Sequence, residues 1–397
     1  MLAATAPHAV LLVGPPSVGK TTLALDFAAG LLCTGATGGD RPCGTCRACR
    51  MVTHGNHPDL HRLAPEGAGD QIGIGGRDRP RGVRDLVGEL ALLPVEGVAR
   101  VAIVERAHRL SDDAQSALLK TLEEPPIGTV LILCADDEER LLPTVRSRCA
   151  RVRLGAVGTR DIERLIVERG VADAPTAARL AHIAAGRPGL ALTYAVSPDA
   201  VRIRGEVVRT LLDLAVGRAS DRLAVARDLL ARAVELAAAL ARADPSQGHA
   251  EAPDAGRGRR RRAGAVPRTT PAGGEDTGEP ETDVETAEST AVKVPASERR
   301  RALALLLDLW AEVARDVAVA AAGAPAALRD PELLEEVGRL AAHLPLESAA
   351  GALVRIARAR ELVEANVSPE LVLDVLLLRW PRAAETPSRP MIGHAAS

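Results

Sequence analysis

The sequence predicts an α/β domain with a parallel sheet, followed by a region made only of helices. Over the first 155 residues, short apolar runs alternate with helical patterns, which is typical of parallel strands joined by helices. From Thr159 onward the strand pattern disappears, and beyond Ala200 the chain is rich in Ala, Leu and Arg, all good helix formers. At 397 residues, the chain is long enough for two or three domains.

Individual elements follow from the apolar runs and from the residues that bound them. The expected strands are His8–Val13, Asp59–Leu63, Val101–Val104, Val130–Cys134 and Arg151–Leu154. The helices expected between them are Thr21–Leu32, Val83–Leu92 and Ser111–Glu124. A small unit of three further helices is expected at Thr159–Arg169, Pro175–Ala185 and Gly189–Ala195. Ser111 is a suitable N-cap, and Pro125-Pro126 ends the helix that it starts.

One segment interrupts the helical region. Residues 244–297 are rich in Pro, Gly, Thr and Glu and hold a basic run, Arg259–Arg262, ahead of an acidic stretch. Because large apolar residues are scarce there, we expect a disordered insertion. Contact of the basic run with DNA or an acidic partner is the alternative. Helices are expected again at Arg299–Ala322 and on to about Trp380, and residues 383–397 are expected to form a flexible tail.

Composition narrows the functional classes. Aromatic residues make up 1% of the chain, too few for the stacked platform that proteins use to grip single-stranded nucleic acid. The net charge of −2 provides no overall positive field for DNA. No run of 18 or more apolar residues is present, so we expect a cytoplasmic protein without a membrane partner.

A phosphate-binding motif lies between the first expected strand and helix. The segment Gly14–Thr21 fits G-x-x-x-x-G-K-[ST], and a strand before it and a helix after it are the context that the motif requires. Lys20 would reach the β- and γ-phosphates of ATP, and Thr21 would hold Mg²⁺. The alternative is a glycine-rich turn that binds nothing. The candidate nucleotide-binding residues of this loop are Gly14, Ser17, Gly19, Lys20, Thr21 and Thr22.

Four of the six cysteines crowd into seventeen residues. Cys33, Cys43, Cys46 and Cys49 have the spacing C-x₉-C-x₂-C-x₂-C, in which each C-x₂-C pair brings two thiolates to one ion. Four sulfur ligands close a tetrahedral site, so the pattern predicts structural Zn²⁺. Cys134 and Cys149 lie in apolar strand surroundings and are expected to be inert core residues.

The acidic motif of a P-loop ATPase is altered. Such an enzyme places Asp for magnesium and then Glu for activation of water after a hydrophobic strand. Here the strand Val101–Val104 is followed by Glu105 and Arg106. Glu105 is a candidate metal ligand through water, but an arginine cannot accept a proton. Efficient ATP hydrolysis by this chain is therefore not expected.

Arg148 is the candidate catalytic residue. It lies in Ser147-Arg148-Cys149, a loop just before the last expected strand of the α/β part. An exposed arginine there could act in trans, against the γ-phosphate held by a neighbouring subunit. The alternative is an arginine in a surface ion pair.

Several of these segments match one family. The matching stretches are Cys33–Cys49, His57–His61 with Ala64-Pro65, Leu118–Pro126, Glu139–Leu142, Ser147–Cys149, Ala185–Gly189 and Ser368–Leu378. Together they resemble the δ′ family of bacterial DNA polymerase III clamp-loader subunits, relatives of the γ/τ motor subunits. The likeness is dense over residues 8–195 and thinner afterwards.

The resemblance implies a domain organisation. It implies an AAA+ P-loop core at residues 1–155 with a zinc module at 33–49, a helical lid at 156–200, and a helical collar at 201–382 interrupted at 244–297. It also implies a function. Such a subunit ends an open ring of five with γ/τ and δ subunits, and Arg148 would complete the ATP site of an adjacent γ/τ subunit. The chain would be a largely non-hydrolysing stator that helps to load the β sliding clamp onto primed DNA during replication.

This chain departs from the motor members of the family at several positions. Those members have Asp-Glu at Glu105-Arg106, an arginine at Gly189, and a polar residue at Ala135. Family members also carry a longer segment before the phosphate loop that helps to enclose adenine. The resemblance therefore implies either a start further upstream or an incomplete adenine pocket.

Three alternatives to this function remain open at the level of sequence. The first is an active motor ATPase of the γ/τ type, favoured by the complete phosphate-loop motif. The second is a zinc-dependent DNA-binding module, which predicts DNA affinity without partner subunits. The third is a small-molecule P-loop kinase, which leaves the cysteine cluster and the carboxy-terminal helices unexplained.

Overall fold

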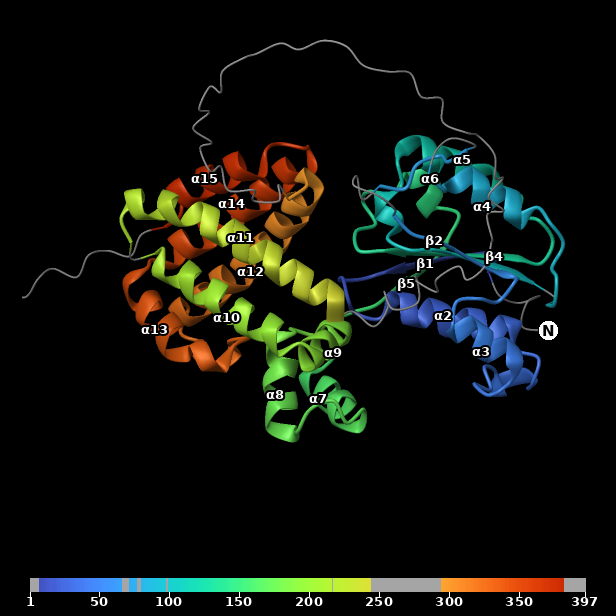
Figure 1. Ribbon diagram of the computed structural model, residues 1–397, viewed down its shortest axis with the longest axis horizontal. Coiled ribbons are helices and arrows are strands. Elements are labelled where there is room, and N and C mark those ends of the chain that lie inside the picture. The colour runs from blue at the N-terminus through green and yellow to red at the C-terminus, as the bar shows by residue number, and fades with distance from the viewer. Residues whose placement is uncertain are drawn as a thin grey trace, which may run out of the picture.

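The computed structural model describes residues 7–65, 71–76, 80–97, 99–215, 217–243 and 294–381. Its amino-terminal part is a five-stranded parallel sheet with helices on both faces, and its remainder is helical (Figure 1). The strands are β1 (Ala9–Val13), β2 (Leu60–Leu63), β3 (Arg100–Val104), β4 (Thr129–Ala135) and β5 (Ala150–Arg153). They lie in the order β2-β3-β4-β1-β5. The predicted fold class is confirmed, and the strands begin and end within one residue of their predicted bounds.

Two helical layers cover the sheet because alternate side chains of each strand point to opposite faces. The helices of this part are α2 (Lys20–Leu32), α3 (Arg47–Thr53), α4 (Val83–Leu90), α5 (Asp112–Glu123) and α6 (Pro143–Arg146). Val10, Leu12 and their neighbours pack against α2 and α3, while Leu11 and its neighbours pack against α4, α5 and α6. Figure 1 shows these two layers on opposite sides of the sheet. β1 and β4 are therefore covered on both faces.

Local signals explain where the helices of this part begin and end. The Ser111 hydroxyl accepts a hydrogen bond from the Ala114 N–H at 3.2 Å, which confirms the predicted N-cap of α5. The predicted helix Val83–Leu92 ends two residues early at Leu90, and Leu93 is 86% exposed beyond it. The short helices α3 and α6 were not predicted.

The helical region forms one continuous buried cluster. Its helices are α7 (Thr159–Glu168), α8 (Ala174–Ile183), α9 (Pro188–Val196), α10 (Pro198–Asp213), α11 (Ala219–Ala243), α12 (Ala296–Ala321), α13 (Leu334–His343), α14 (Leu346–Glu364) and α15 (Pro369–Leu378). Among the described residues, buried side chains from Ile162 of α7 to Leu377 of α15 belong to a single hydrophobic cluster. The division of this region into lid and collar stays a prediction. The predicted insertion lies outside the described residues from 244 to 293, as does the predicted tail.

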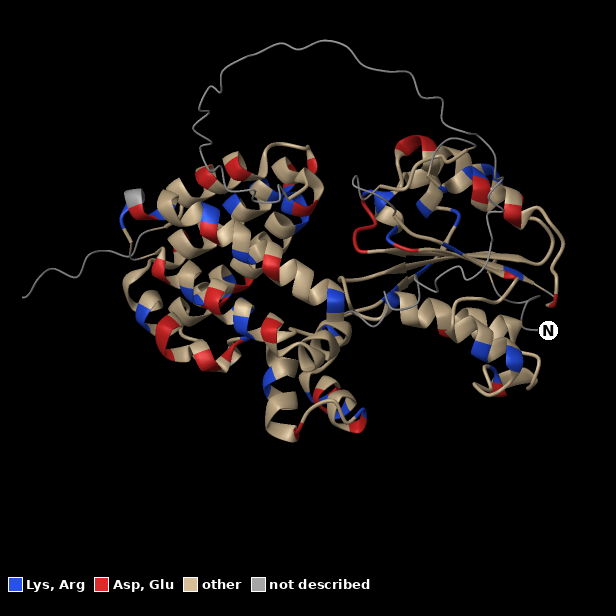
Figure 2. Cartoon of the chain, in the orientation of Figure 1, with Lys and Arg blue, Asp and Glu red and all other residues tan. Residues whose placement is uncertain are grey.

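Charge is distributed in small groups over the described residues. Figure 2 shows Lys and Arg interspersed with Asp and Glu along the helices of the carboxy-terminal region. This pattern agrees with the near-zero net charge of the sequence. None of the helices described here combines the length and the apolar character that crossing a bilayer requires.

A buried ionic junction ties three helical segments together. Arg187, at the start of α9, pairs with Glu312 of α12. Arg204 of α10 lies 3.6 Å from the other oxygen of Glu312 and donates to Asp330 at 2.9 Å. The Arg204 side chain is 6% exposed and that of Glu312 is 10% exposed. Because an unpaired charge is costly at this depth, the junction fixes α9 and α10 against α12.

We therefore expect Glu312→Ala to lower the free energy of unfolding by about 3–5 kcal/mol, since it leaves two buried arginines without this carboxylate. Urea unfolding followed by tryptophan fluorescence measures the change. Trp310 and Trp380 are the only tryptophans and lie 4.7 Å apart by ring centroids in this region, so the signal reports on it directly. Glu235→Ala, at an exposed site of α11, is the control and should change stability by less than about 0.5 kcal/mol. Equal effects of the two substitutions would contradict the prediction.

Candidate functional site

The predicted phosphate loop lies at the carboxyl end of β1, between that strand and α2. Gly19 adopts φ 105° at the start of α2, in a region that favours glycine. A Cβ atom on Gly14 would lie 2.4 Å from the Leu154 carbonyl oxygen, so only glycine fits there. Ser17 has φ 60°, which is uncommon for a residue with a side chain. The loop conformation therefore depends on glycine at two of the motif positions.

The Lys20 ammonium group is fully engaged by protein acceptors. It lies 2.6 Å from an Asp136 carboxylate oxygen. It also donates to the carbonyl oxygens of Gly14 at 2.8 Å and Pro15 at 2.6 Å. An ammonium group has three hydrogens, and three acceptors take them. In this arrangement the lysine does not fit a nucleotide phosphate, because it has no hydrogen left to donate to one.

The remaining predicted nucleotide ligands divide between two places. Thr21 is half-buried and Thr22 is exposed in the first turn of α2, next to Lys20. Glu105 lies at the end of β3, two strands away from β1, and pairs with Arg62 of β2 at 2.6 Å. Its carboxylate is therefore turned toward the β2 side of the sheet. Arg106 follows it with φ 51°.

The helical region contacts the phosphate loop through the first turn of α9. The Gly189 N–H, in the first turn of α9, donates to the Ser17 carbonyl oxygen at 2.9 Å. A Cβ atom on Gly189 would lie 3.0 Å from the same oxygen. A larger residue there would have to push the loop away, so the glycine allows this close contact.

The predicted catalytic arginine lies in the turn between α6 and β5, at the amino ends of β1 and β5, whereas the phosphate loop lies at the carboxyl end of β1. Arg148 pairs with Glu123, at the end of α5, at 2.6 Å and donates to the Thr144 carbonyl oxygen at 2.9 Å. Its side chain is 35% exposed and that of Glu123 is 49% exposed. The turn is short and ordered by backbone hydrogen bonds from Ser147 and Arg148. The Arg148 side chain therefore lies at the surface, on a turn whose backbone is hydrogen-bonded.

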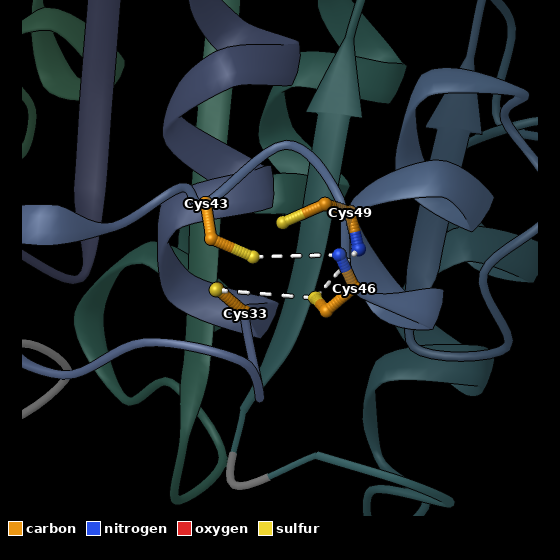
Figure 3. A group of neighbouring side chains, drawn as sticks. All are labelled: Cys33, Cys43, Cys46 and Cys49. Atoms are coloured by element: carbon orange, nitrogen blue, oxygen red, sulfur yellow. Dashed lines mark hydrogen bonds between the residues drawn. The ribbon is translucent and has the colours of Figure 1, made fainter.

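The four predicted cysteine ligands lie together, as Figure 3 shows. All four sulfur atoms are within 4.8 Å of one another, a spacing that suits tetrahedral ligands with metal–sulfur distances of about 2.3 Å. The Cys46 sulfur accepts a hydrogen bond from the Cys49 N–H at 3.4 Å, which lowers the pKa of Cys46 to about 5. Burial raises the pKa of Cys49 to about 12. The cluster can hold a metal ion.

The cysteine cluster is remote from the phosphate loop. Cys33 directly follows the last residue of α2, whereas Lys20 is the first. Thirteen helical residues separate the two sites by about 20 Å. A metal ion bound by the four cysteines would therefore hold α3 and the segment before it against α2. It would take no part in chemistry at the phosphate loop.

The comparisons with known proteins agree with these features over the amino-terminal part. Residues 2–157 match the family described as DNA polymerase III, delta subunit. The DNA polymerase III subunit delta' of Pseudomonas aeruginosa is 42% identical over 144 residues, which cover 36% of this chain and 42% of the relative. Over residues 2–157 the chain is therefore similar to the DNA polymerase III delta' subunits. The Escherichia coli subunit delta' is also 42% identical, over 142 residues that cover 36% of this chain and 40% of the relative.

A subunit named tau is also similar. The DNA polymerase III subunit tau of Salmonella typhimurium is 35% identical over 194 residues, which cover 47% of this chain and 28% of the relative. This chain thus spans less than half the length of each of these curated relatives. A solved structure of a gamma subunit-related protein from Thermotoga maritima covers 91% of this chain and 97% of its own, at 15% identity and a TM-score of 0.33. Because a TM-score of 0.33 is too low to establish a common fold, the fold class of this chain follows from its own sheet topology.

The structure adds two residues that the sequence did not indicate, Asp136 and His108. Asp136 follows β4 and belongs to the acidic run Asp136–Glu139, which has the character of a solvated charge run. Its backbone N–H donates to His108 Nδ1 at 3.1 Å. Burial lowers the pKa of His108 to about 4. Only the order of the strands brings Asp136 to Lys20, so no spacing in the sequence could have identified it.

Zinc in the cysteine cluster is testable by metal analysis. We expect one Zn²⁺ per purified chain and none in Cys49→Ser, because three thiolates hold the ion much more weakly than four. The thermal midpoint should fall with the metal, since binding free energy adds to folding. Atomic emission and a thermal melt measure the two quantities. Cys149→Ala, a buried cysteine outside the cluster, is the control and should keep its zinc. Wild-type protein purified without metal would contradict the prediction.

Proposed function

We propose that this chain is a largely non-hydrolysing subunit of the DNA polymerase III clamp loader. It supplies Arg148 in trans to the ATP site of a neighbouring γ/τ subunit and helps to load the β sliding clamp onto primed DNA. The observation that carries the proposal is the contrast between two cations, Lys20 and Arg148. Lys20 is 7% exposed and its hydrogens are all taken within the chain, whereas Arg148 is at the surface.

The surroundings of Arg148 suit a group that acts on another subunit. Its carboxylate partner, Glu123, is half exposed, and ion pairs of this kind contribute only about 0–1 kcal/mol. A phosphate presented by a neighbouring chain carries more negative charge and accepts two guanidinium N–H groups at once. Replacement of Glu123 by such a phosphate therefore loses little free energy of interaction within this chain.

The chain's own nucleotide site supports the non-hydrolysing part of the proposal. Arg106 stands where a P-loop ATPase has its general base, and an arginine accepts no proton. Glu105 is paired with Arg62 and is turned away from the phosphate loop. Neither of the two residues that follow β3 therefore combines the position and the chemistry of a catalytic base.

The helical region supports the role of a stator. A stator must keep its shape while neighbouring subunits move, and the junction of Arg187, Arg204 and Glu312 holds the helical segments together by buried charges. A further ion pair joins Arg140, in the loop after β4, to Glu364 of α14, so the α/β part is also connected to the carboxy-terminal helices.

Reconstitution with γ/τ and δ subunits tests the trans arginine. We expect Arg148→Ala to reduce clamp loading by at least about tenfold, because a trans arginine stabilises charge on the transferred phosphoryl group. The ring of five subunits should still assemble, since the side chain is at the surface. Loading is followed with a labelled β clamp, and assembly by size-exclusion chromatography.

Arg153→Ala is the matched control. Arg153 lies on β5, is 71% exposed and pairs with Glu138, so its loss should leave loading within about twofold of wild type. Normal loading by Arg148→Ala would refute the trans role. Brisk ATP turnover by the isolated chain would instead favour a motor ATPase, and DNA binding by the isolated chain would favour a zinc-dependent DNA-binding module.

A further inference from the structure

The carboxylate of Asp136 lies where a nucleotide phosphate would have to bind to Lys20. β4 pairs with β1 in a register that sets Ala135 beside Val13, and the Gly14 N–H donates to the Ala135 carbonyl oxygen at 3.2 Å. Asp136 is the next residue and therefore begins the loop directly beside the phosphate-binding motif. This arrangement puts an anion, by backbone geometry alone, next to the first residue of the loop.

The position of Asp136 is fixed from two sides. Its backbone N–H donates to His108 Nδ1 at 3.1 Å, and His108 Nε2 lies 3.6 Å from its second carboxylate oxygen. With Nδ1 accepting, the ring hydrogen is on Nε2, which faces that oxygen. The first oxygen is 2.6 Å from Lys20. The side chain is thus held in the position that makes the lysine contact.

We propose that the Asp136 carboxylate is a built-in competitor for the phosphates of a nucleotide, and that it sets the nucleotide affinity of this chain. Two of the three ammonium hydrogens of Lys20 go to the carbonyl oxygens of Gly14 and Pro15, and only the third is available to an anion. A phosphate and Asp136 need that same hydrogen. Because the carboxylate is part of the chain, its effective concentration at the lysine is high and does not depend on dilution.

The contact between the helical region and the loop strengthens this competition. The Gly189 N–H donates to the Ser17 carbonyl oxygen at 2.9 Å, so α9 contacts the loop in the conformation in which Lys20 meets Asp136. An incoming phosphate must displace the carboxylate and meet a loop that is already tied to α9. The inference rests on the phosphate-loop assignment within the proposed function, but it does not depend on Arg148 or on partner subunits.

Removal of the Asp136 charge tests the inference. Asp136→Asn keeps the size and one acceptor oxygen but removes the carboxylate charge, so that the ion pair with Lys20 becomes a weaker hydrogen bond to an uncharged acceptor. We expect it to bind fluorescent ADP and ATP, with Mg²⁺, at least about tenfold more tightly than the wild-type chain. Fluorescence anisotropy of the full-length chain measures the affinity, and circular dichroism checks that each variant is folded.

Two further variants make the result decisive. Asp137→Asn removes the same charge one residue later, where the side chain is 53% exposed and lies 3.8 Å from Arg140, and should leave the affinity unchanged. Lys20→Ala combined with Asp136→Asn should lose the gain, because the freed cation is then missing. The inference is overturned if folded Asp136→Asn binds no more tightly than wild type, if Asp137→Asn gives the same gain, or if the gain survives without Lys20. None of these results tests the proposed role of Arg148 in clamp loading. The proposal about Asp136 and the proposed function can therefore be refuted independently of each other.

Discussion

A buried positive charge needs an opposite charge, and in this chain that requirement is met at Lys20. The lysine is 7% exposed at the point where the sheet, the phosphate loop and α9 meet. A charge buried at this depth without a partner would carry a large desolvation cost. Asp136 provides the compensation from the end of β4, and the backbone carbonyls of Gly14 and Pro15 complete it. The phosphate loop thus has two separate ties within the chain: this pairing, and the hydrogen bond from the Gly189 N–H of α9 to the Ser17 carbonyl oxygen.

The same requirement explains how the helical region keeps its arrangement. Arg187 and Arg204 are largely buried between helices, and each depends on Glu312 of α12. A buried ion pair adds little net stability over a well-packed apolar pair, but removal of one partner is costly. The pairs therefore discriminate against other arrangements of these helices more than they stabilise this one. This property suits a subunit whose proposed role is to hold its shape within a moving ring.

Much of the α/β fold could be predicted from sequence because its signals are local. Buried strands such as Val101–Val104 are short apolar runs, and the cysteine spacing predicts a group of four neighbouring sulfur atoms whatever the surrounding fold. The short helix α3 was missed because the signal that starts it is the Cys46 sulfur, which accepts from the Cys49 N–H as a capping serine would. Strand order was the larger obstacle. It joins Asp136 to Lys20 over more than a hundred residues and turns Glu105 toward Arg62, and neither contact leaves a pattern in the sequence.

Burial separates the two cations that the sequence associates with phosphate. A phosphate that reaches Arg148 displaces a half-exposed carboxylate that water can solvate at once, so little is lost. A phosphate that reaches Lys20 must displace a carboxylate held by His108 and the strand end, and the Lys20 side chain itself is only 8% exposed. The motif that looks complete in sequence is thus the one closed by its own chain, whereas the lone arginine is open to a neighbour. In the proposed function, accessibility of the cation, and not completeness of the motif, decides which of the two acts on a nucleotide.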